Sequence, residues 1–457
     1  MRILIGGEDE VAFRLVESLM ADHAITLVCP ETAQHEDRVA RMDAERIVGS
    51  MTSPPVLRQA KVADVDLFIG CSPVDERNLV ACLSAKRLGA HRTICFLMRP
   101  DLQMPEEDAE GLAESLGVDQ IVRPGQQLAE EILRIIAVPG ALDVQVFAGG
   151  RVHLLRYAVE PEAAIIQGKL KDVGVPPGVV LVMGKREDQV FVPTGDTEFQ
   201  PGDKLTAMGS MVGINRLLAR YLRASSGGAR RHDATVVGGG TVGLSVALGL
   251  EAAGWSVRVI ESDRKRCEEI AKDLEGLVLH GDGADLDLLQ NERIGERPVL
   301  VAVTSNDEKN LLVSLLAKSL GVNRIVTRAD HLSNERLFER VGIDVVLSAR
   351  GAAVRSVLRS VDVARTEMLA ELELGDAEIL ELVLPSDLPP VPLMRMKSGL
   401  LGIIGAILRK GQVIIPRGTD HVEGGDHLIV FCMREVEEDV REFFLHRIKD
   451  LANEPES

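Results

Sequence analysis

The chain has 457 residues, too many for one hydrophobic core, and usual domain sizes predict about three to four domains. Its formal net charge of −18 and aromatic content of 3% argue against a nucleic-acid partner, because phosphate backbones need a concentrated basic surface and bases stack on aromatic side chains. The six cysteines form no CxxC pair and no Cys/His cluster with zinc spacing, so we expect buried, reduced thiols and no metal site.

The N-terminal residues form a strand-like segment without the pattern of a signal peptide. The longest apolar run, residues 399–408, has about half the length that a membrane-spanning helix needs. We therefore expect a cytosolic protein that reaches a membrane only through a partner.

Residues 2–137 alternate short apolar runs with amphipathic stretches. This alternation predicts βαβ units, which form a parallel sheet covered by helices on both faces. The expected strands are residues 2–5, 25–29, 46–48, 67–70 and 93–97, and the expected helices are residues 11–21, 78–88, 106–115 and 127–137. The same pattern returns with strands expected at 234–237, 257–260, 277–279, 299–303 and 324–327.

Each of these units is followed by a smaller segment with short β-like runs and turn signals. The two small segments share a tail, ValPheValProThrGly in one and ValIleIleProArgGly in the other, each followed by a GlyAsp turn before an apolar strand. We therefore predict an α/β chain with two Rossmann-like, doubly wound parallel-sheet domains, each followed by a small α+β domain. The predicted ranges are 1–138, 139–223, a linker at 224–232, 233–362, 363–446 and a charged tail at 447–457.

One stretch of the second half has the pattern of a dinucleotide-binding turn. It reads AlaThrValValGlyGlyGlyThrValGly and places Gly238, Gly240 and Gly243 in GxGxxG spacing, between an apolar strand and a helical pattern. Gly238 permits a tight turn, Gly240 lets the backbone approach a phosphate, and Gly243 lets the helix pack on the sheet. The amides at the helix start, around Thr241 and Val242, then face the anion. The alternative is a purely structural turn.

An acidic residue follows at the spacing that this motif requires. Glu261 ends the next strand, where its carboxylate can accept hydrogen bonds from both ribose hydroxyls of NAD and repel the 2′-phosphate of NADP. The alternative for Glu261 is a solvated strand end. Four further residues are candidates for the site: Asp282 and Gly283 at the adenine or ribose rim, Thr304 at the carboxyl edge of the sheet, and Arg328 for a phosphate. Each is also consistent with a surface turn or a helix cap.

The first half repeats this arrangement with its site residues changed. Asn310 and Asn78, Gly281 and Gly49, and Gly238 and Gly6 are each 232 positions apart. This offset places Glu8, Val11 and Cys29 where the second half has Gly240, Gly243 and Glu261. A carboxylate about 4 Å from a phosphate costs about 4 kcal/mol at an effective dielectric constant of about 20, more than a helix start offers an anion. We therefore expect a degenerate first site. Its three acidic residues, Glu8, Asp9 and Glu10, either satisfy the helix amides or form a site for a cation or a basic partner.

The repeated units carry the matched segments AlaValThrSerAsnAspGluLysAsnLeu and GlyCysSerProValAspGluArgAsnLeu. Together with the GxGxxG remnants and the shared tails, they resemble the TrkA family, the tandem cytosolic regulators of Trk potassium uptake systems, built as RCK_N, RCK_C, RCK_N, RCK_C. The resemblance covers essentially the whole chain. The first unit departs from it, because family members commonly keep both the glycine pattern and the ribose acid.

The resemblance implies a non-enzymatic gating-ring subunit that binds NAD(H), or ATP and ADP at the same site. It implies nucleotide contacts at Gly238, Gly240, Gly243, Glu261 and Asp282. It also implies a homo-oligomer, dimer or tetramer, beneath a potassium-translocating membrane subunit of the Trk type, at the inner face of the cell membrane. We expect residues 350–361 and their counterpart near 127–137 to form dimer contacts in this ring. The alternatives are a nucleotide sensor of another transporter and an NAD-dependent dehydrogenase, which would need a positioned acid or base and a substrate pocket.

Overall fold

The structure is a computed structural model that describes residues 1–20, 23–31, 42, 44–99, 115–138, 140–187, 189–222, 232–362, 368–372, 377–396 and 402–449. The chain divides into two compact units. The first contains Met1–Leu133 and Arg230–Ser360, and the second contains Arg134–Ala229 and Val361–Ser457. Each unit therefore combines corresponding pieces of the two halves of the sequence.

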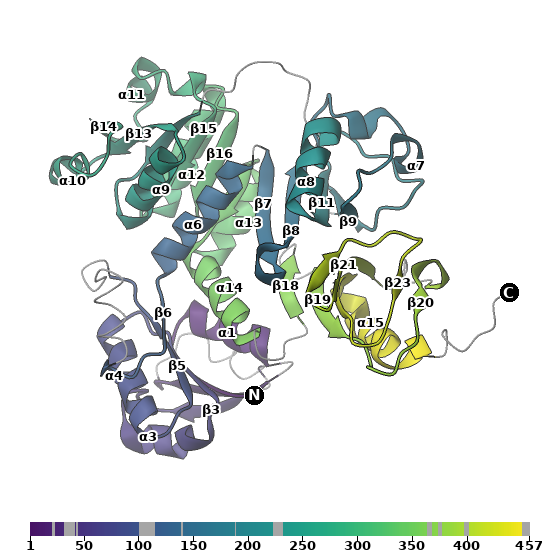
Figure 1. Ribbon diagram of the computed structural model, residues 1–457. Helices are drawn as coiled ribbons and strands as arrows, with labels where there is room; N and C mark the ends of the chain where they lie inside the picture. The colour runs from purple at the N-terminus through teal and green to yellow at the C-terminus, as the bar shows by residue number, and fades with distance from the viewer. Residues whose placement is uncertain are drawn as a thin grey trace. The chain divides into compact units, whose positions relative to one another are not determined.

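The described residues of the first unit form two six-stranded parallel sheets with the same strand order (Figure 1). The order β3-β2-β1-β4-β5-β6 is repeated as β14-β13-β12-β15-β16-β17, which is the order of a Rossmann fold. The first sheet has β1 (Arg2–Gly6), β2 (Ala24–Cys29), β3 (Glu45–Val48), β4 (Leu67–Gly70), β5 (Arg92–Phe96) and β6 (Gln120–Val122). The second has β12 (Asp233–Val237), β13 (Ser256–Glu261), β14 (Leu277–His280), β15 (Val299–Ala302), β16 (Arg324–Arg328) and β17 (Val345–Leu347).

Among the described helices of each half, all but the last connect two strands of the sheet by crossovers. Because such crossovers are right-handed, the helices that follow β12 and β15 cover opposite faces. In the first half they are α1 (Glu10–Leu19), α3 (Pro54–Gln59), α4 (Asp75–Arg87) and α6 (Pro124–Ala137), with a 3-10 turn η1 (Val62–Asp64). In the second they are α9 (Thr241–Ala252), α10 (Arg264–Ile270), α11 (Leu286–Asn291), α12 (Asp307–Ser319), α13 (Leu332–Arg340) and α14 (Ala349–Asp362), with a 3-10 turn η6 (Ile294–Glu296).

The sequence predicted these elements well, and the misses have simple causes. Every expected strand is present to within about one residue at each end. The strands β6 and β17 were missed, because three residues are too few to show a periodic pattern. The helix α6 begins at Pro124 rather than at Gln127, since proline suits the first helical position. The helix expected at 106–115 lies outside the described residues, apart from its last residue.

Burial explains why the strands read as continuous apolar runs. All four residues of β15 are buried, as are all four of β4. A strand in the middle of a parallel sheet is covered on both faces, so it shows no alternation of apolar and polar side chains.

The described residues of the second unit form two five-stranded antiparallel sheets of equivalent topology, β10-β9-β11-β8-β7 and β22-β21-β24-β19-β18. The first has β7 (Ala141–Phe147), β8 (Val152–Ala158), β9 (Val179–Arg186), β10 (Gln189–Phe191) and β11 (Lys204–Gly209). The second has β18 (Met368–Leu372), β19 (Ala377–Val383), β21 (Ile403–Arg409), β22 (Gln412–Ile414) and β24 (His427–Met433), and the short strands β20 (Val391–Pro392) and β23 (His421–Val422) pair separately.

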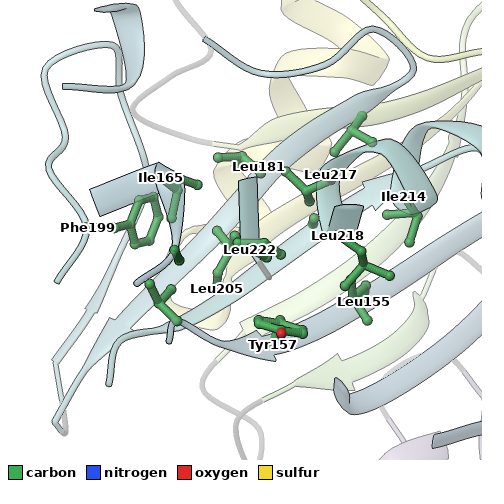
Figure 2. Close-up of a cluster of buried hydrophobic side chains, with 14 of the residues drawn as sticks. Leu155, Tyr157, Ile165, Leu181, Phe199, Leu205, Ile214, Leu217, Leu218 and Leu222 are labelled. Atoms are coloured by element: carbon green, nitrogen blue, oxygen red, sulfur yellow. The ribbon is translucent and has the colours of Figure 1, made fainter. Parts of the chain in front are cut away.

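Short helices cover these sheets and complete the α+β class that the sequence predicted. They are α7 (Leu170–Val173), α8 (Met211–Leu217) and α15 (Glu437–Glu442), with π-helical turns η5 (Leu218–Leu222) and η11 (Phe443–Arg447) and 3-10 turns η3 (Ala148–Gly150), η4 (Ala164–Gln167), η8 (Leu393–Arg395) and η10 (Arg434–Val436). Figure 2 shows the core under α8, where Leu155, Tyr157, Ile165, Leu181, Phe199, Leu205, Ile214, Leu217, Leu218 and Leu222 pack together.

The two sheets of the second unit share a hydrophobic cluster. It contains Leu154 and Met208 from one sheet and Ile379 and Phe431 from the other. Gly405 permits this packing, because a Cβ there would lie only 2.2 Å from Sδ of Met208. The duplicated small domains are therefore packed against each other.

The repeated GlyAsp turns hold equivalent buried ion pairs. Asp203 and Asp426, with side chains 2% and 1% exposed, each accept two hydrogen bonds from an arginine, Arg186 or Arg409. Each carboxylate also accepts a backbone amide of its own turn. The turn motif that the sequence repeats is therefore a buried anchor for a strand arginine.

The end of the second small domain differs from the prediction. The tail was expected to begin at residue 447, but residues 447–449 are still helical and Ile448 is fully buried. Phe444 and Ile448 belong to the core of this domain. The sequence did not show the burial of Ile448, because its neighbours Arg447 and Lys449 are charged.

Two expectations from composition are tested directly. All six cysteines are buried and unpaired, as predicted. Across the described ranges, no helix combines the length and apolar character needed to cross a bilayer.

Candidate functional site

The glycine-rich turn lies at the topological switch point of the second parallel sheet. The strands β12 and β15 are neighbours, and their following helices leave to opposite faces. Gly238, directly after β12, has φ of +106°, and a Cβ there would lie 3.0 Å from the backbone N of Thr304. Ligands of doubly wound sheets bind at this edge, so Gly238 and Thr304 are correctly placed for the predicted site.

The other two motif glycines have different physical roles. A Cβ on Gly243 would lie 1.8 Å from the carbonyl oxygen of Gly238, so only glycine allows α9 to start this close to the turn. A Cβ on Gly240 would meet no described heavy atom within 4 Å. Gly240 is the N-cap of α9 and offers it no side-chain acceptor. We call the amides of Thr241, Val242 and Gly243 at this helix start the α9 amide site. Its open approach over Gly240 suits an anion.

Glu261 lies beside this turn and is firmly oriented. Its Oε2 accepts a hydrogen bond from the amide of Gly239 at 2.6 Å, and its Oε1 accepts one from the amide of Asp263 at 2.8 Å. Burial opposes the charge, but these hydrogen bonds outweigh it and lower the pKa of Glu261 below its usual value. The carboxylate is therefore ionised at neutral pH.

Asp282 and Gly283 follow β14 at the same edge of the sheet. Asp282 Oδ1 accepts the Ala284 amide at 2.9 Å and pairs with Nζ of Lys309 at 2.9 Å. These two contacts lower the pKa of Asp282. A Cβ on Gly283 would lie 2.2 Å from Cγ1 of Val237, so this glycine is required by packing against the end of β12.

Thr304 and Arg328 are fixed by neighbouring side chains. Thr304 donates its amide and its hydroxyl to Oδ1 of Asn310, and Asn310 Nδ2 donates to the carbonyls of Thr304 and Arg328. This asparagine therefore joins the ends of β15 and β16. The Arg328 guanidinium pairs with Asp330, its Nε lying 3.0 Å from both carboxylate oxygens. Arg328 can therefore bind a phosphate only if the phosphate replaces Asp330 or shares the guanidinium with it.

Three residues beside the candidate site escaped the sequence prediction. Lys309 and Asp330 pair with predicted site residues, and Asn310 joins two strand ends. Asp307, the first residue of α12, accepts hydrogen bonds from the amides of Asp330 and His331 in the loop after β16. One sequence signal could have found Asn310: both halves carry Asp-x-x-Asn, as Asp75/Asn78 and as Asp307/Asn310. In the first half, Asp75 and Asn78 bind the backbone of the loops after β4 and β5, as Asp307 and Asn310 bind the corresponding loops of the second half.

The strand pairings correct the register that was predicted for the first half. Arg2 pairs with Ala24, whereas Asp233 pairs with Ser256. Ala24 and Ser256 are 232 positions apart, but Arg2 and Asp233 are 231 apart. The expectation of one constant offset is therefore wrong for β1. The cause is one additional residue between the start of α9 and β13, which a gap-free comparison does not detect.

The corrected register continues into the following helix. The helices α1 and α9 begin at Glu10 and Thr241, again 231 positions apart. The counterpart of Gly240 is therefore Asp9 and not Glu8, and that of Gly243 is Ala12 and not Val11. Cys29 remains the counterpart of Glu261, because the offset of 232 holds from β2 to β5.

In the first half, an aspartate occupies the helix start that is open in the second. Asp9 Oδ1 accepts the amides of Val11 and Ala12 at 3.1 and 3.4 Å. Burial raises the pKa of Asp9, against the lowering effects of the Ala12 amide and the charge of Arg350. Of the alternatives for the acidic cluster, the structure shows amide capping by Asp9. Among the described residues, no group of three or more His, Cys, Asp or Glu side chains is arranged to hold a metal ion.

The helices that end the two parallel-sheet domains contact the opposite half of the same chain. Leu133 of α6 packs on Gly249 of α9, since a Cβ on Gly249 would lie 2.4 Å from Leu133 Cδ1. Arg355 of α14 donates two hydrogen bonds to Glu131 of α6 at 2.7 and 2.8 Å. The contacts expected between chains are thus made within one chain.

Near the glycine-rich turn, α6 reaches the start of α9. A Cβ on Gly125 would lie 3.4 Å from Cγ2 of Val242, in ordinary van der Waals contact. Residue 242 is the second residue of α9 and belongs to the α9 amide site. The start of α6 therefore lies close to the candidate site of the second half.

This fold and site define a tandem of TrkA-N domains. The model of the TrkA-N domain matches residues 3–124 and 234–349, and that of the TrkA-C domain matches residues 154–221. The chain belongs to the Trk system potassium uptake protein TrkA family. It is 33% identical over 447 residues to a TrkA homolog of Archaeoglobus fulgidus, covering 97% of this chain and 100% of that relative. It is 31% identical over 441 residues to TrkA of Haemophilus influenzae, covering 94% and 95% of the two chains.

Solved structures show the same fold at low sequence identity. The crystal structure of the GsuK RCK domain matches with a TM-score of 0.59 and 19% identity, over 97% of this chain and 94% of that chain. The GsuK channel bound to NAD matches with a TM-score of 0.58 and 18% identity, over 97% and 78% of the two chains. The α/β class with paired Rossmann-like sheets is therefore confirmed.

Proposed function

We propose that this chain is a nucleotide-binding regulatory subunit of a Trk-type potassium uptake system. One observation carries the proposal: Gly240 leaves the start of α9 open beside the ionised carboxylate of Glu261, whereas Asp9 fills the same place in the first half. The family supplies the connection to potassium transport. The nucleotide binds to the second half only, at one site per chain.

The ligand that fits best is NAD(H), with ATP or ADP as alternatives at the same site. The pyrophosphate meets Gly238, Gly240 and the amides of Thr241, Val242 and Gly243. Glu261 exchanges its bond to the Gly239 amide for ribose hydroxyls and repels the 2′-phosphate of NADP. Asp282 and Gly283 border the adenine or ribose, and Thr304 and Arg328 border the phosphates. A structure of the same fold is described as bound to NAD, which agrees with this choice.

The contact between α6 and α9 provides a route from ligand to partner. A ligand changes an equilibrium only if it binds one arrangement better than another. A nucleotide on the α9 amide site lies next to Val242, and Gly125 of α6 lies close to that side chain. The ligand therefore favours one arrangement of the two halves, and a membrane potassium-translocating subunit responds to it.

The proposal includes a homo-oligomeric ring on the cytoplasmic face of the membrane, formed by surfaces other than α6 and α14. A ring matches the symmetry of a pore, and the chain itself carries two domains with the same strand order. Light scattering at micromolar concentration should give a dimer or tetramer. A monomer alone would contradict the ring.

The experiment that tests the function is complementation. In a strain that lacks its own Trk regulator but has a matched membrane subunit, the wild-type chain should restore potassium uptake and Gly240→Asp should not. Gly240→Ala is the matched control and should restore uptake. Failure of the wild type, with the protein folded and nucleotide-binding, would favour a different transporter. Nucleotide-dependent turnover of a substrate would favour the dehydrogenase alternative.

A further inference from the structure

We propose that Lys309 is a phosphate-binding residue of the second-half site, and that Glu8 and Asp9 of the first half take the places of two ligand phosphates. This inference rests on the proposed nucleotide-binding function and adds a residue that the GxGxxG pattern does not contain. The evidence comes from comparing the two halves at equivalent positions.

Lys309 and Arg77 occupy the same position of equivalent helices. Asn310 and Asn78, the next residues of α12 and α4, each donate to the carbonyls at the ends of two neighbouring strands. The offset of 232 is therefore structurally correct for these helices. A cation stands at the same point of both halves.

In the first half, this cation reaches the loop before the nucleotide-type helix. Nη1 of Arg77 lies 3.0 Å from Oε1 of Glu8, the residue that precedes the N-cap Asp9. Glu8 corresponds to Gly239 in the corrected register. A cation at position 309 is therefore within reach of an anion that lies over Gly239 and Gly240.

The two carboxylates of the first half bind as two linked anions would. Asp9 accepts the helix amides, and Glu8 pairs with Arg77. In the second half, the helix amides and the cation remain but glycines replace both acids. Lys309 pairs with Asp282 in this structure, but no acid stands over the helix start itself, so this position is open to a ligand that supplies the two anions. A pyrophosphate consists of two adjacent anionic groups, and it therefore fits both partners at once.

The ion pair that Lys309 makes in this structure can be exchanged easily. Its partner Asp282 is 54% exposed and is also held by the Ala284 amide. Exposed ion pairs contribute little stability, so exchange of Asp282 for a phosphate costs little. Asp282 then keeps its place without the lysine.

The alternative is that Lys309 only positions Asp282, which lies at the adenine or ribose rim. The two roles differ in which part of the ligand they affect. Phosphate binding concerns ADP but not adenosine, whereas positioning of Asp282 concerns both ligands equally.

The test is calorimetric titration of the full chain with ADP and with adenosine. For Lys309→Gln we expect ADP affinity to fall about 10- to 100-fold, the usual range for a lost charge-assisted hydrogen bond, with adenosine affinity unchanged. Lys309→Arg should retain ADP binding, because arginine holds this position in the first half. Lys272→Gln, an exposed lysine of the same half, is the control for net charge. Arg77→Gln should leave ADP affinity unchanged, because its partner is Glu8.

Equal weakening of ADP and adenosine, or unchanged ADP affinity in Lys309→Gln, would overturn the inference. Thermal unfolding of each variant confirms that it is folded. A wild-type chain that binds neither ligand would refute the proposed function itself, and with it this inference.

Discussion

Gly240→Asp should weaken nucleotide binding while leaving the fold intact. The backbone of Gly240 has φ of −66° and ψ of −172°, the extended conformation of an N-cap. Asp9, its counterpart, has φ of −122° and ψ of −177° and caps α1. Because a Cβ at residue 240 meets no described heavy atom within 4 Å, the aspartate fits and caps α9. Replacing glycine by aspartate at an N-cap changes stability by only a few tenths of a kcal/mol.

The expected loss of affinity follows from Coulomb's law. A carboxylate about 4 Å from a phosphate costs about 1 kcal/mol in bulk water and about 4 kcal/mol at an effective dielectric constant of about 20. Gly240 is exposed on one side and lies at a helix start, so the cost falls between these limits. The dissociation constant should therefore rise at least about 5-fold and up to about 1,000-fold. The new carboxylate also occupies the amides that the ligand needs.

The assay combines calorimetry with NAD(H) and thermal unfolding without ligand. Gly240→Ala separates charge from bulk, because it adds the same Cβ without a carboxylate, and it should bind within a few-fold of wild type. Wild-type affinity in Gly240→Asp would refute the reasoning about the α9 amide site. Unfolding of Gly240→Asp would refute the reasoning about its N-cap geometry.

Three further predictions concern packing and protonation. Glu131→Gln should lower the free energy of unfolding by about 1–2 kcal/mol in urea denaturation, because the 9% exposed carboxylate loses charged hydrogen bonds from Arg355. An effect no larger than that of the control Glu268→Gln, in an exposed ion pair, would contradict this. Burial opposes the charge of Asp307, but amide hydrogen bonds lower its pKa below the usual 3.8. The ionised carboxylate therefore stabilises the folded chain above pH 3.8, and this stabilisation is lost as the pH falls through the lowered pKa. Asp307→Asn should therefore lose less stability than wild type between about pH 5 and pH 3, and parallel pH profiles would count against this assignment. A hydrogen bond with Cys95, together with burial, raises the pKa of the Cys82 thiol, and burial raises that of Cys432 to about 12. Iodoacetamide at about pH 8 should therefore modify no cysteine of the folded chain and all six after unfolding. Rapid labelling of either thiol in the folded chain would show that its burial is wrong.

The sequence predicted the parallel-sheet domains well because their signals are local. Apolar runs such as that of β15 and the spacing of Gly238, Gly240 and Gly243 each depend on residues close together in the chain. The order of strands followed from the fold class to which these elements belong. The three-residue strands β6 and β17 could not be predicted, because only pairing with a neighbouring strand defines them.

The candidate site was predicted in its motif residues and missed in their partners. Lys309 pairs with Asp282 of another loop, which no spacing rule connects, and Asp330 pairs with Arg328 two residues before it in a loop that carries no motif. The register of the first half failed by one residue for a related reason. A single insertion between α9 and β13 has no local signature, and only the pairing of Arg2 with Ala24 revealed it.

A compensating exchange supports the corrected register. In the second half, the large Val237 lies against Gly283, where a Cβ would be 2.2 Å away. In the first half, Gly6 is the counterpart of Val237 and lies against Met51, the counterpart of Gly283. The large and small partners are exchanged, so each domain fills the same space. Comparison of either residue alone would not have revealed this.

The central claim is that the chain binds nucleotide at one of its two equivalent places, and the most direct test is the number of NAD(H) molecules bound per wild-type chain. Calorimetric titration to saturation, with chain concentration determined independently, measures this number. The account predicts one per chain, bound to the second half. Two per chain would contradict the claim that Asp9 and Cys29 have closed the first site, and none would contradict the claim that the open start of α9 is a nucleotide site.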